Sequence, residues 1–504
     1  MDNGIFLGGG GVNHGLPQYL RLDLANRHGL IAGATGTGKT VTLQILAEGF
    51  SAAGVPVFLS DVKGDVSGIG AAGSAGFKLH EAFMKRAATI GLDLRYSAFP
   101  VTFWDLFGQQ GHPIRATVAE LGPLLLSRLL ELTEAQEGVV NIAFRVADEQ
   151  GLALLDLKDL QSLLVWVGEN REDLSLRYGN VSTASIGAIQ RRLLVLENQG
   201  GAHLFGEPAL DLADLMRLAP DGRGQVNILA ADQLMEAPRL YATFLLWLLS
   251  ELFETLPEIG NPDKPRLVFF FDEAHFLFED APKALIDKVE QVARLIRSKG
   301  VGVYFITQHP GDVPADVLGQ LGNRVQHALR AFTANDRAQL QQAARTYREN
   351  PRFSTEEAIR EVGTGEAVTS MLEEKGVPGM VERTLIRPPS SMLGPIGAEA
   401  RAALMAASEM AAKYDRSIDR DSAHEVLLER AAAAARAAEQ AAQTQSQDRE
   451  FNAARRYSGG RARPEAPGAD SLGAALGSAL VKELKGTTGR RILRGLFGTL
   501  FKGR

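Results

Sequence analysis

The hydrophobic pattern of the chain consists of short apolar runs that alternate with stretches of helical spacing. The runs are continuous rather than alternating, as expected for strands buried on both faces. They lie at 29–32, 55–60, 225–230, 267–271 and 301–307. Apolar residues at helical spacing follow several of these runs, at 41–46, 239–255 and 284–298. Strands alternating with helices predict an α/β fold with a mostly parallel sheet flanked by helices.

Two segments depart from this pattern and set the expected domain organisation. Residues 76–220 carry helical spacing over long stretches, which predicts an all-α insertion between the two parts of a sheet domain, 1–75 and 221–392. This insertion covers the ligand crevice or a neighbouring subunit, or it is a packing module without a moving part. Residues 393–504 predict a helical tail.

The predicted tail changes character along its length. It is alanine-rich through Ala438, then polar with Pro and Gly from about 443 to 468, which indicates a flexible linker. The last stretch places apolar residues on one helical face and adds four cations, Arg490, Arg491, Arg494 and Lys502. Such a basic amphipathic C-terminus suits docking into a neighbouring subunit, with anionic lipid or DNA as the alternative.

The first apolar run breaks into a glycine-rich turn that predicts a phosphate-binding loop. The spacing Gly33-x4-Gly38-Lys39-Thr40 matches the P-loop pattern, between a strand and a helix. Glycines let successive N–H groups point at one anion, Lys39 adds a positive charge, and Thr40 can offer a hydroxyl to Mg²⁺. The predicted nucleotide-binding residues are Gly33, Ala34, Thr35, Gly36, Thr37, Gly38, Lys39, Thr40 and Val41.

Polar residues also follow two later strands. Asp272 and Glu273 end the run at 267–271, so Asp272 is the candidate for the magnesium shell and Glu273 for activating a water. Gln308 follows the run at 301–307, where a neutral amide can bond both the γ-phosphate and the attacking water. A helix cap or a loop hydrogen bond is the alternative for Gln308.

Other charged residues are secondary candidates. Asp61 and Lys63 follow the strand at 55–60, although a helix cap or a solvated loop explains them about equally well. Arg324 stands at the start of a later strand and is the first candidate for an arginine finger, with Arg330 second. A surface salt bridge is the alternative for Arg324.

Composition and charge further restrict the class of protein. The 504 residues include 45% hydrophobic and 23% charged residues and no cysteine, which fits a globular protein without disulfides or thiolate metal sites. The net charge is −6, yet residues from 395 onward hold 18 Lys and Arg against 13 Asp and Glu. DNA contact would therefore need a local basic surface. The sequence shows neither a signal peptide nor a membrane span, so we expect a cytoplasmic protein.

Taken together, the motifs resemble the HerA/FtsK group of P-loop ATPases, and within it the bacterial HerA-like helicases of the YjgR type. The motifs that carry the resemblance, in chain order, are Gly33 to Thr40, Asp61-Val62-Lys63-Gly64, Phe271 to His275, Thr307-Gln308 and Leu321 to Arg324. The resemblance implies a RecA-like sheet of the ASCE type and a hexameric ring with ATP and Mg²⁺ between subunits. It also implies DNA and a nuclease or other protein as partners. The segment before Gly33 is too short for the full barrel of HerA proper.

By the same resemblance, the site residues take defined roles. Lys39 and Thr40 bind phosphate and magnesium, Asp272 and Glu273 are the Walker B acids, Gln308 is the sensor, and Arg324 is the finger that acts on the next subunit. The expected function is an ATP-driven DNA translocase or helicase. The alternative is an ATP-dependent switch or assembly scaffold without motor activity, which the acidic body and the helical insertion favour. A small-molecule kinase is disfavoured, since Glu273 beside Asp272 suits water activation.

Overall fold

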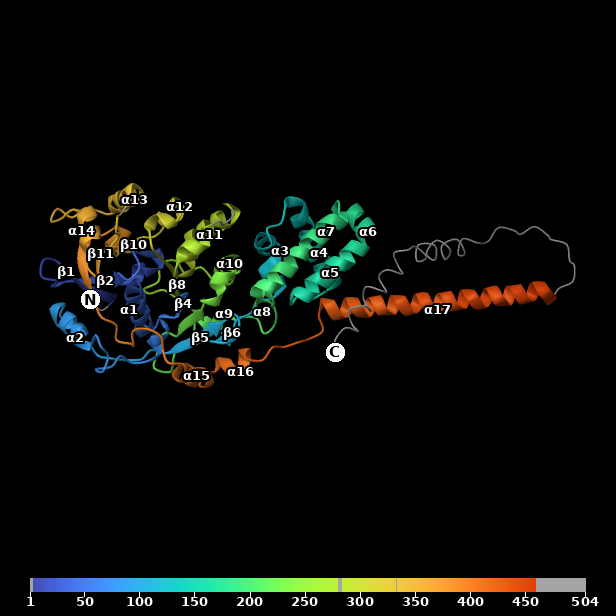
Figure 1. The fold of residues 1–504 in the computed structure, drawn as a ribbon, viewed down its shortest axis with the longest axis horizontal. Coiled ribbons are helices and arrows are strands. Elements are labelled where there is room, and N and C mark those ends of the chain that lie inside the picture. Colours follow the sequence, from blue (N-terminus) through green and yellow to red (C-terminus); the bar gives the residue numbers. More distant parts are fainter. Residues whose placement is uncertain (1–2, 280–282, 332, 459–504) are drawn as a thin grey trace. The chain divides into compact units, whose positions relative to one another are not determined.

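The computed structural model describes residues 3–279, 283–331 and 333–458. The chain divides into two compact units, Met1–His424 and Glu425–Arg504, and the first unit contains the sheet (Figure 1). Among the described residues, no helix has both the length and the apolar character that crossing a bilayer requires.

Twelve strands form one sheet within the described residues (Figure 1). In spatial order they are β2 (Leu16–Arg21), β1 (Gly4–Gly10), β12 (Glu382–Ile386), β11 (Glu366–Ser370), β10 (Asn323–Gln326), β3 (Gly29–Ala32), β9 (Val301–Thr307), β8 (Leu267–Phe271), β4 (Val57–Asp61), β7 (Val226–Ala230), β5 (Val101–Asp105) and β6 (His112–Pro113). The strands from β10 to β6 are parallel, and β11, β12, β1 and β2 add an antiparallel edge. The predicted mostly parallel sheet is confirmed.

Apolar packing on both faces of the central strands explains their continuous hydrophobic runs. On one face, α1 (Lys39–Ala52) places Phe50 against Phe270 of β8, with ring centroids 6.1 Å apart. On the other face, α10 (Pro238–Thr255) places Tyr241 against β4, where its hydroxyl donates to Ser60 Oγ at 2.7 Å. Residues of β8 are therefore buried on both sides, as parallel strands between helices must be.

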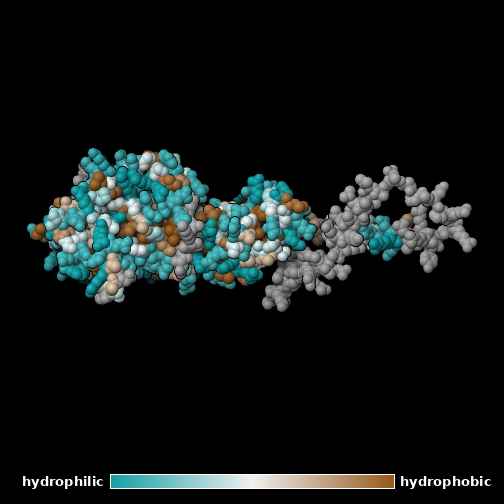
Figure 2. All heavy atoms as spheres, turned by 90° about the horizontal axis from the view of Figure 1, so that it is seen from above, coloured by the Kyte–Doolittle hydropathy of each residue, from teal (hydrophilic) through white to brown (hydrophobic). Residues whose placement is uncertain are grey.

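Further helices complete the first unit, and α11 (Lys283–Ile296) among them lies close to the helical spacing at 284–298. In the second half of the sheet domain they are α11, α12 (Ala315–Leu318), α13 (Ala334–Arg345) and α14 (Thr355–Glu361). The hairpin of β1 and β2 joins the sheet edge, and the described residues contain no closed barrel. Figure 2, which views the molecule of Figure 1 from above, shows apolar side chains scattered among hydrophilic ones.

The expectation that residues 76–220 are entirely helical is wrong. The segment begins with α2 (His80–Thr89) and then supplies β5, which pairs with β7 inside the main sheet. Trp104 of β5 is buried and donates to Asn227 Oδ1 at 3.0 Å. The helical part starts later and comprises α3 (Val118–Leu129), α4 (Glu134–Gln150), α5 (Leu157–Glu169), α6 (Arg171–Tyr178), α7 (Thr183–Leu196), α8 (Ala202–Leu204) and α9 (Leu212–Leu215). Of these, α3 to α7 lie together at one side of the sheet (Figure 1).

The tail also differs from the expected order of helix and linker. After α15 (Ala398–Ala406) and α16 (Met410–Tyr414), helix α17 runs over Ala423–Ser458. It therefore continues through the first part of the linker expected at 443–468, because Ala, Gln and Arg keep helical propensity there. The rest of that linker and the basic amphipathic C-terminus lie outside the described residues.

A buried polar clasp fastens the end of the sheet domain to the helix that follows the glycine-rich turn. Glu48 of α1 accepts from Arg387 Nη2 at 3.1 Å. The same carboxylate accepts from the backbone N–H groups of Ser390 and Ser391 and from the Ser391 hydroxyl, at 2.6–3.1 Å. Both charged side chains are largely buried, and breaking one partner of such a pair would leave a costly unpaired charge.

Candidate active site

The glycine-rich turn after β3 adopts a backbone that only glycine accepts easily. Gly33 and Gly38 have φ angles of 153° and 117°. A Cβ on Gly33 would lie 2.5 Å from the Cβ of His327, which follows β10. The turn therefore lies directly against the neighbouring strand end, with its exposed tip at Thr35 and Gly36.

Lys39 begins α1 and bends back over this turn. Its Nζ donates to the carbonyl oxygens of Gly33 at 2.5 Å and Ala34 at 3.3 Å. Burial lowers the pKa of Lys39, while the nearby carboxylate of Glu273 opposes that shift. The ammonium group is thus held at the mouth of the turn, on the side where the N-terminus of α1 favours an anion.

The two acids after β8 reach the same edge of the sheet. Only β9 separates β8 from β3, so their carboxyl ends are two strand spacings apart, roughly 10 Å. One strand therefore stands between the strand before the glycine-rich turn and the strand before the two acids. Glu273 has a φ angle of +48°, an unusual backbone for a residue other than glycine. Such strained positions gather at functional sites.

Glu273 is surrounded by three polar partners. Its Oε1 lies 2.5 Å from Lys63 Nζ, and its Oε2 lies 3.4 Å from both Gln308 Nε2 and His275 Nδ1. Burial alone would raise the pKa of Glu273. The hydrogen bond and charge of Lys63, with Gln308 and Lys39, outweigh burial and lower this pKa below its ordinary value. The carboxylate is therefore ionised at neutral pH.

Asp272 is more enclosed than its neighbour. It is 6% exposed, and its backbone is fixed by Ser60 and Tyr241. Burial, with the charge of Glu273 second, raises the pKa of Asp272 to about 7. A divalent cation beside this carboxylate would favour its ionised form.

The turn after β4 contributes one acid that holds the backbone, Asp61, and one further carboxylate, Asp65, near the glycine-rich turn. Asp61 accepts from the backbone N–H groups of Asp65 and Val66, each at 3.1 Å, and burial raises its pKa to about 6. Asp61 thus holds the turn. The Thr40 hydroxyl donates to Asp65 Oδ2 at 3.4 Å. Oxygen donors of this kind are those that Mg²⁺ prefers, although no group of three or more His, Asp or Glu forms a metal cage in the described residues.

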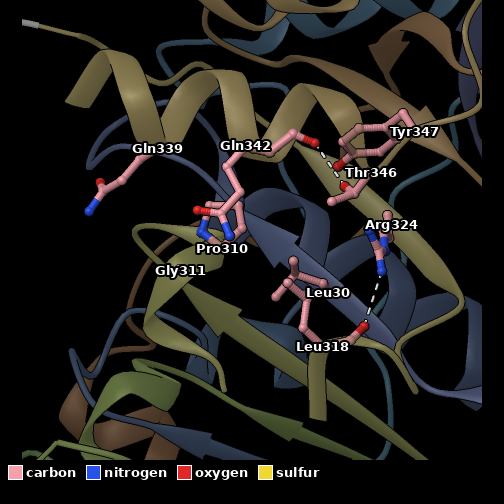
Figure 3. A pocket seen from close by; sticks show the side chains of 10 residues that line it. Leu30, Pro310, Gly311, Leu318, Arg324, Gln339, Gln342, Thr346 and Tyr347 are labelled. Atoms are coloured by element: carbon pink, nitrogen blue, oxygen red, sulfur yellow. Dashed lines mark hydrogen bonds between the residues drawn. The ribbon is translucent and has the colours of Figure 1, made fainter. Parts of the chain in front are cut away.

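Arg324 lies apart from these residues. Its guanidinium donates to the backbone oxygens of Leu318 and Leu321, each at 3.0 Å. Figure 3 shows it in a small cavity between the 310–311 turn and α13, which Gln342 and Tyr347 also line. Gln308 lines a different hollow, with His275 and Asp312. The structure therefore does not bring Arg324 to the Glu273 of its own chain, and Arg330 is exposed.

His327 supports the turn and was not singled out from the sequence. It is buried, its Nδ1 donates to the Glu366 carbonyl at 3.0 Å, and its Nε2 then accepts from the Thr42 hydroxyl at 2.8 Å. Burial lowers the pKa of His327 to about 4, so the ring is neutral. Its place at the end of β10, parallel to β3, is the signal that could have indicated it.

Comparisons with known proteins identify a matching family and several solved structures of similar fold. Residues 11–504 match the family described as Helicase HerA-like C-terminal. No curated protein sequence matches the chain. Among solved structures, the unbound bacterial conjugative coupling protein TrwB is 15% identical, with 77% of this chain and 91% of that chain covered and a TM-score of 0.47. TrwB with a non-hydrolysable GTP analogue is 16% identical, with 76% and 92% covered and a TM-score of 0.48. VirB4 of Thermoanaerobacter pseudethanolicus is 15% identical, with 77% and 97% covered and a TM-score of 0.47.

Proposed function

The chain belongs to the HerA-like helicase C-terminal family, and from this premise we propose that it is a Mg²⁺-dependent ATPase that moves along or separates DNA. The observation that carries the proposal is the meeting of three strand ends at one sheet edge. There the glycine-rich turn after β3, Glu273 after β8 and Gln308 after β9 lie together, and Glu273 contacts Gln308.

Each residue has a role in the proposed hydrolysis. The N–H groups of residues 33–41 and the N-terminus of α1 bind the phosphates, and Lys39 exchanges its carbonyl partners for phosphate oxygens. Thr40 and Asp272 would hold Mg²⁺, and a bound Mg²⁺ would supply positive charge to the phosphates. Glu273 accepts the proton of the attacking water, and Gln308 orients that water. The structures of TrwB with a non-hydrolysable ATP analogue and with ADP and Mg²⁺ contain these ligands.

The proposal extends to a ring in which one subunit completes the site of the next. Arg324 supports this step, because it lies away from its own Glu273 and is partly exposed. In a ring, its guanidinium would leave the Leu318 and Leu321 carbonyls and stabilise charge on the neighbour's phosphates.

A second candidate function is a nucleotide-dependent switch without motor action. The Lys63–Glu273 ion pair favours it, since a base paired with a lysine is less free to activate water. The switch would bind ATP and hydrolyse it slowly whether or not DNA is present.

The test is the rate of ATP hydrolysis with and without DNA, measured with the oligomer mass in solution. We expect duplex or single-stranded DNA to raise the turnover rate severalfold. A turnover rate that ignores both forms of DNA would exclude the motor and leave the switch. Lys39→Ala is the control for contaminating ATPases, because it removes the phosphate-binding cation.

A further inference from the structure

The hydroxyl of Thr40 has an unexpected partner. A threonine that ligates a cation uses an oxygen lone pair, so its hydrogen must be donated elsewhere. In this structure the hydroxyl donates to Asp65 Oδ2, at 3.4 Å. Asp65 therefore fixes the direction of the Thr40 hydrogen and leaves the oxygen lone pairs for a cation. The sequence pattern assigns no role to Asp65.

The second oxygen of Asp65 lacks a donor. Asp65 Oδ1 is buried and has no hydrogen-bond partner among the described residues. A buried carboxylate oxygen without a donor is costly, and a native site usually supplies one. A water molecule bound to a cation is a strong donor, because the cation polarises its O–H bonds.

The turn that carries Asp65 is held in place from within. The carboxylate of Asp61 binds the N–H groups of Asp65 and Val66, so the turn returns toward α1 after leaving β4. Lys63 of the same turn lies 2.5 Å from Oε1 of Glu273, the residue that follows Asp272. Thr40 of α1 and Asp65 of this turn therefore lie beside each other at the edge of the sheet where β4 ends.

We propose that Asp65 is a metal-positioning residue of this site, which orients the Thr40 hydroxyl through Oδ2 and holds a water of the Mg²⁺ shell through Oδ1. This inference rests on the proposed ATPase function. Residues that orient metal ligands typically change metal affinity by about 10-fold to 100-fold when they are lost. Asp65 should therefore affect the Mg²⁺ requirement more than the affinity for nucleotide alone.

The experiment measures binding of a fluorescent ATP analogue to the full chain, in EDTA and over a series of free Mg²⁺ concentrations. For Asp65→Asn we expect the Mg²⁺ concentration at half-maximal binding to rise about 10-fold, while affinity in EDTA stays within about twofold of wild type. Glu279→Gln is the matched control, because Glu279 is an exposed acid near Gln308 and His275. Its Mg²⁺ requirement should match that of wild type.

The outcomes separate this inference from the function on which it rests. A wild-type Mg²⁺ requirement in Asp65→Asn overturns the inference and leaves the ATPase proposal intact. Equal weakening in EDTA and in Mg²⁺ also overturns it, since that indicates a structural role. Binding to the wild type that is absent or independent of Mg²⁺ overturns both. If Asp65→Asn fails to fold, Asp65→Glu carries the test, with a smaller rise expected because its carboxylate is displaced by one methylene.

Discussion

Lys63 Nζ lies 2.5 Å from Glu273 Oε1 and joins the turn after β4 to the acid after β8, across 210 positions of sequence. Glu273 is nearly enclosed, whereas the Lys63 side chain is 40% exposed. Lys63 is therefore the partner that can leave the ion pair, by moving into solvent. Lys63 both keeps the Glu273 carboxylate ionised and occupies one of its two oxygens.

Replacing Lys63 should release the base. In Lys63→Met we expect ATP turnover without DNA to rise about threefold, since a half-exposed ion pair is worth on the order of 0.7 kcal/mol. Stimulation by DNA should shrink by a similar factor. Steady-state ATPase assays measure both quantities. Unchanged or slower turnover without DNA would show that Lys63 does not restrain Glu273.

Removing the carboxylate charge of Glu273 should separate binding from hydrolysis. In Glu273→Gln we expect nucleotide binding to persist and turnover to fall by about two orders of magnitude or more, because the general base is lost. Lys39→Ala should instead lose binding itself. Fluorescent nucleotide binding and single-turnover hydrolysis measure the two steps. Wild-type turnover in Glu273→Gln would remove this residue from the mechanism.

Arg324 offers a test of the shared site. Arg324→Ala should bind nucleotide normally and hydrolyse it slowly, and Arg330→Ala should behave like wild type. Mixing Arg324→Ala with Glu273→Gln should restore part of the activity, because some interfaces would combine an intact base with an intact finger. Inactivity of every mixture, in oligomers shown to exchange subunits, would contradict action between subunits.

A buried histidine should make the fold sensitive to acid. His28 accepts from the Val303 N–H at 3.0 Å through Nδ1 and donates from Nε2 to the Ala293 carbonyl at 2.6 Å. Burial lowers the pKa of His28 to about 4, from an ordinary value of 6.5. Between these values the unfolded state binds a proton that the folded state excludes, so His28 costs stability as the pH falls through this window.

The matching experiment compares unfolding by urea for wild type and His28→Gln. The variant should be less stable at pH 7.5, and the difference should shrink by roughly 2 kcal/mol at pH 5. Asp61 and Asp272, whose pKa values are raised, act in the opposite direction but are common to both proteins. A difference that is constant with pH would show that His28 does not carry the titration.

Local patterns predicted the elements whose burial is uniform along the chain. The runs that became β3, β8 and β9 are continuous in hydrophobicity, and the residues that end them follow the strands directly. Parallel strands align their carboxyl ends, so the shared edge of Glu273 and Gln308 could be expected from order alone. Their individual roles remain predictions.

Features that depend on distant pairing could not be predicted in the same way. Strand β5 is only five residues long, and its partner β7 lies more than a hundred positions later. The contacts of Glu273 with Lys63 and of Thr40 with Asp65 join turns whose spacing is set by the folded sheet. Helix α17 continued into the first part of the expected linker, to Ser458, because local helical propensity outweighed polar composition there.

The clasp around Glu48 gives the P-loop helix a second attachment. The first turn of α1 begins at the glycine-rich turn. Its later turns are hydrogen-bonded through Arg387 to the segment that leaves the sheet. Helix α1 is therefore held near both of its ends, so its two ends are expected to move together. A displacement of the first turn of α1 would therefore also displace residues 387–391, where the chain leaves the sheet.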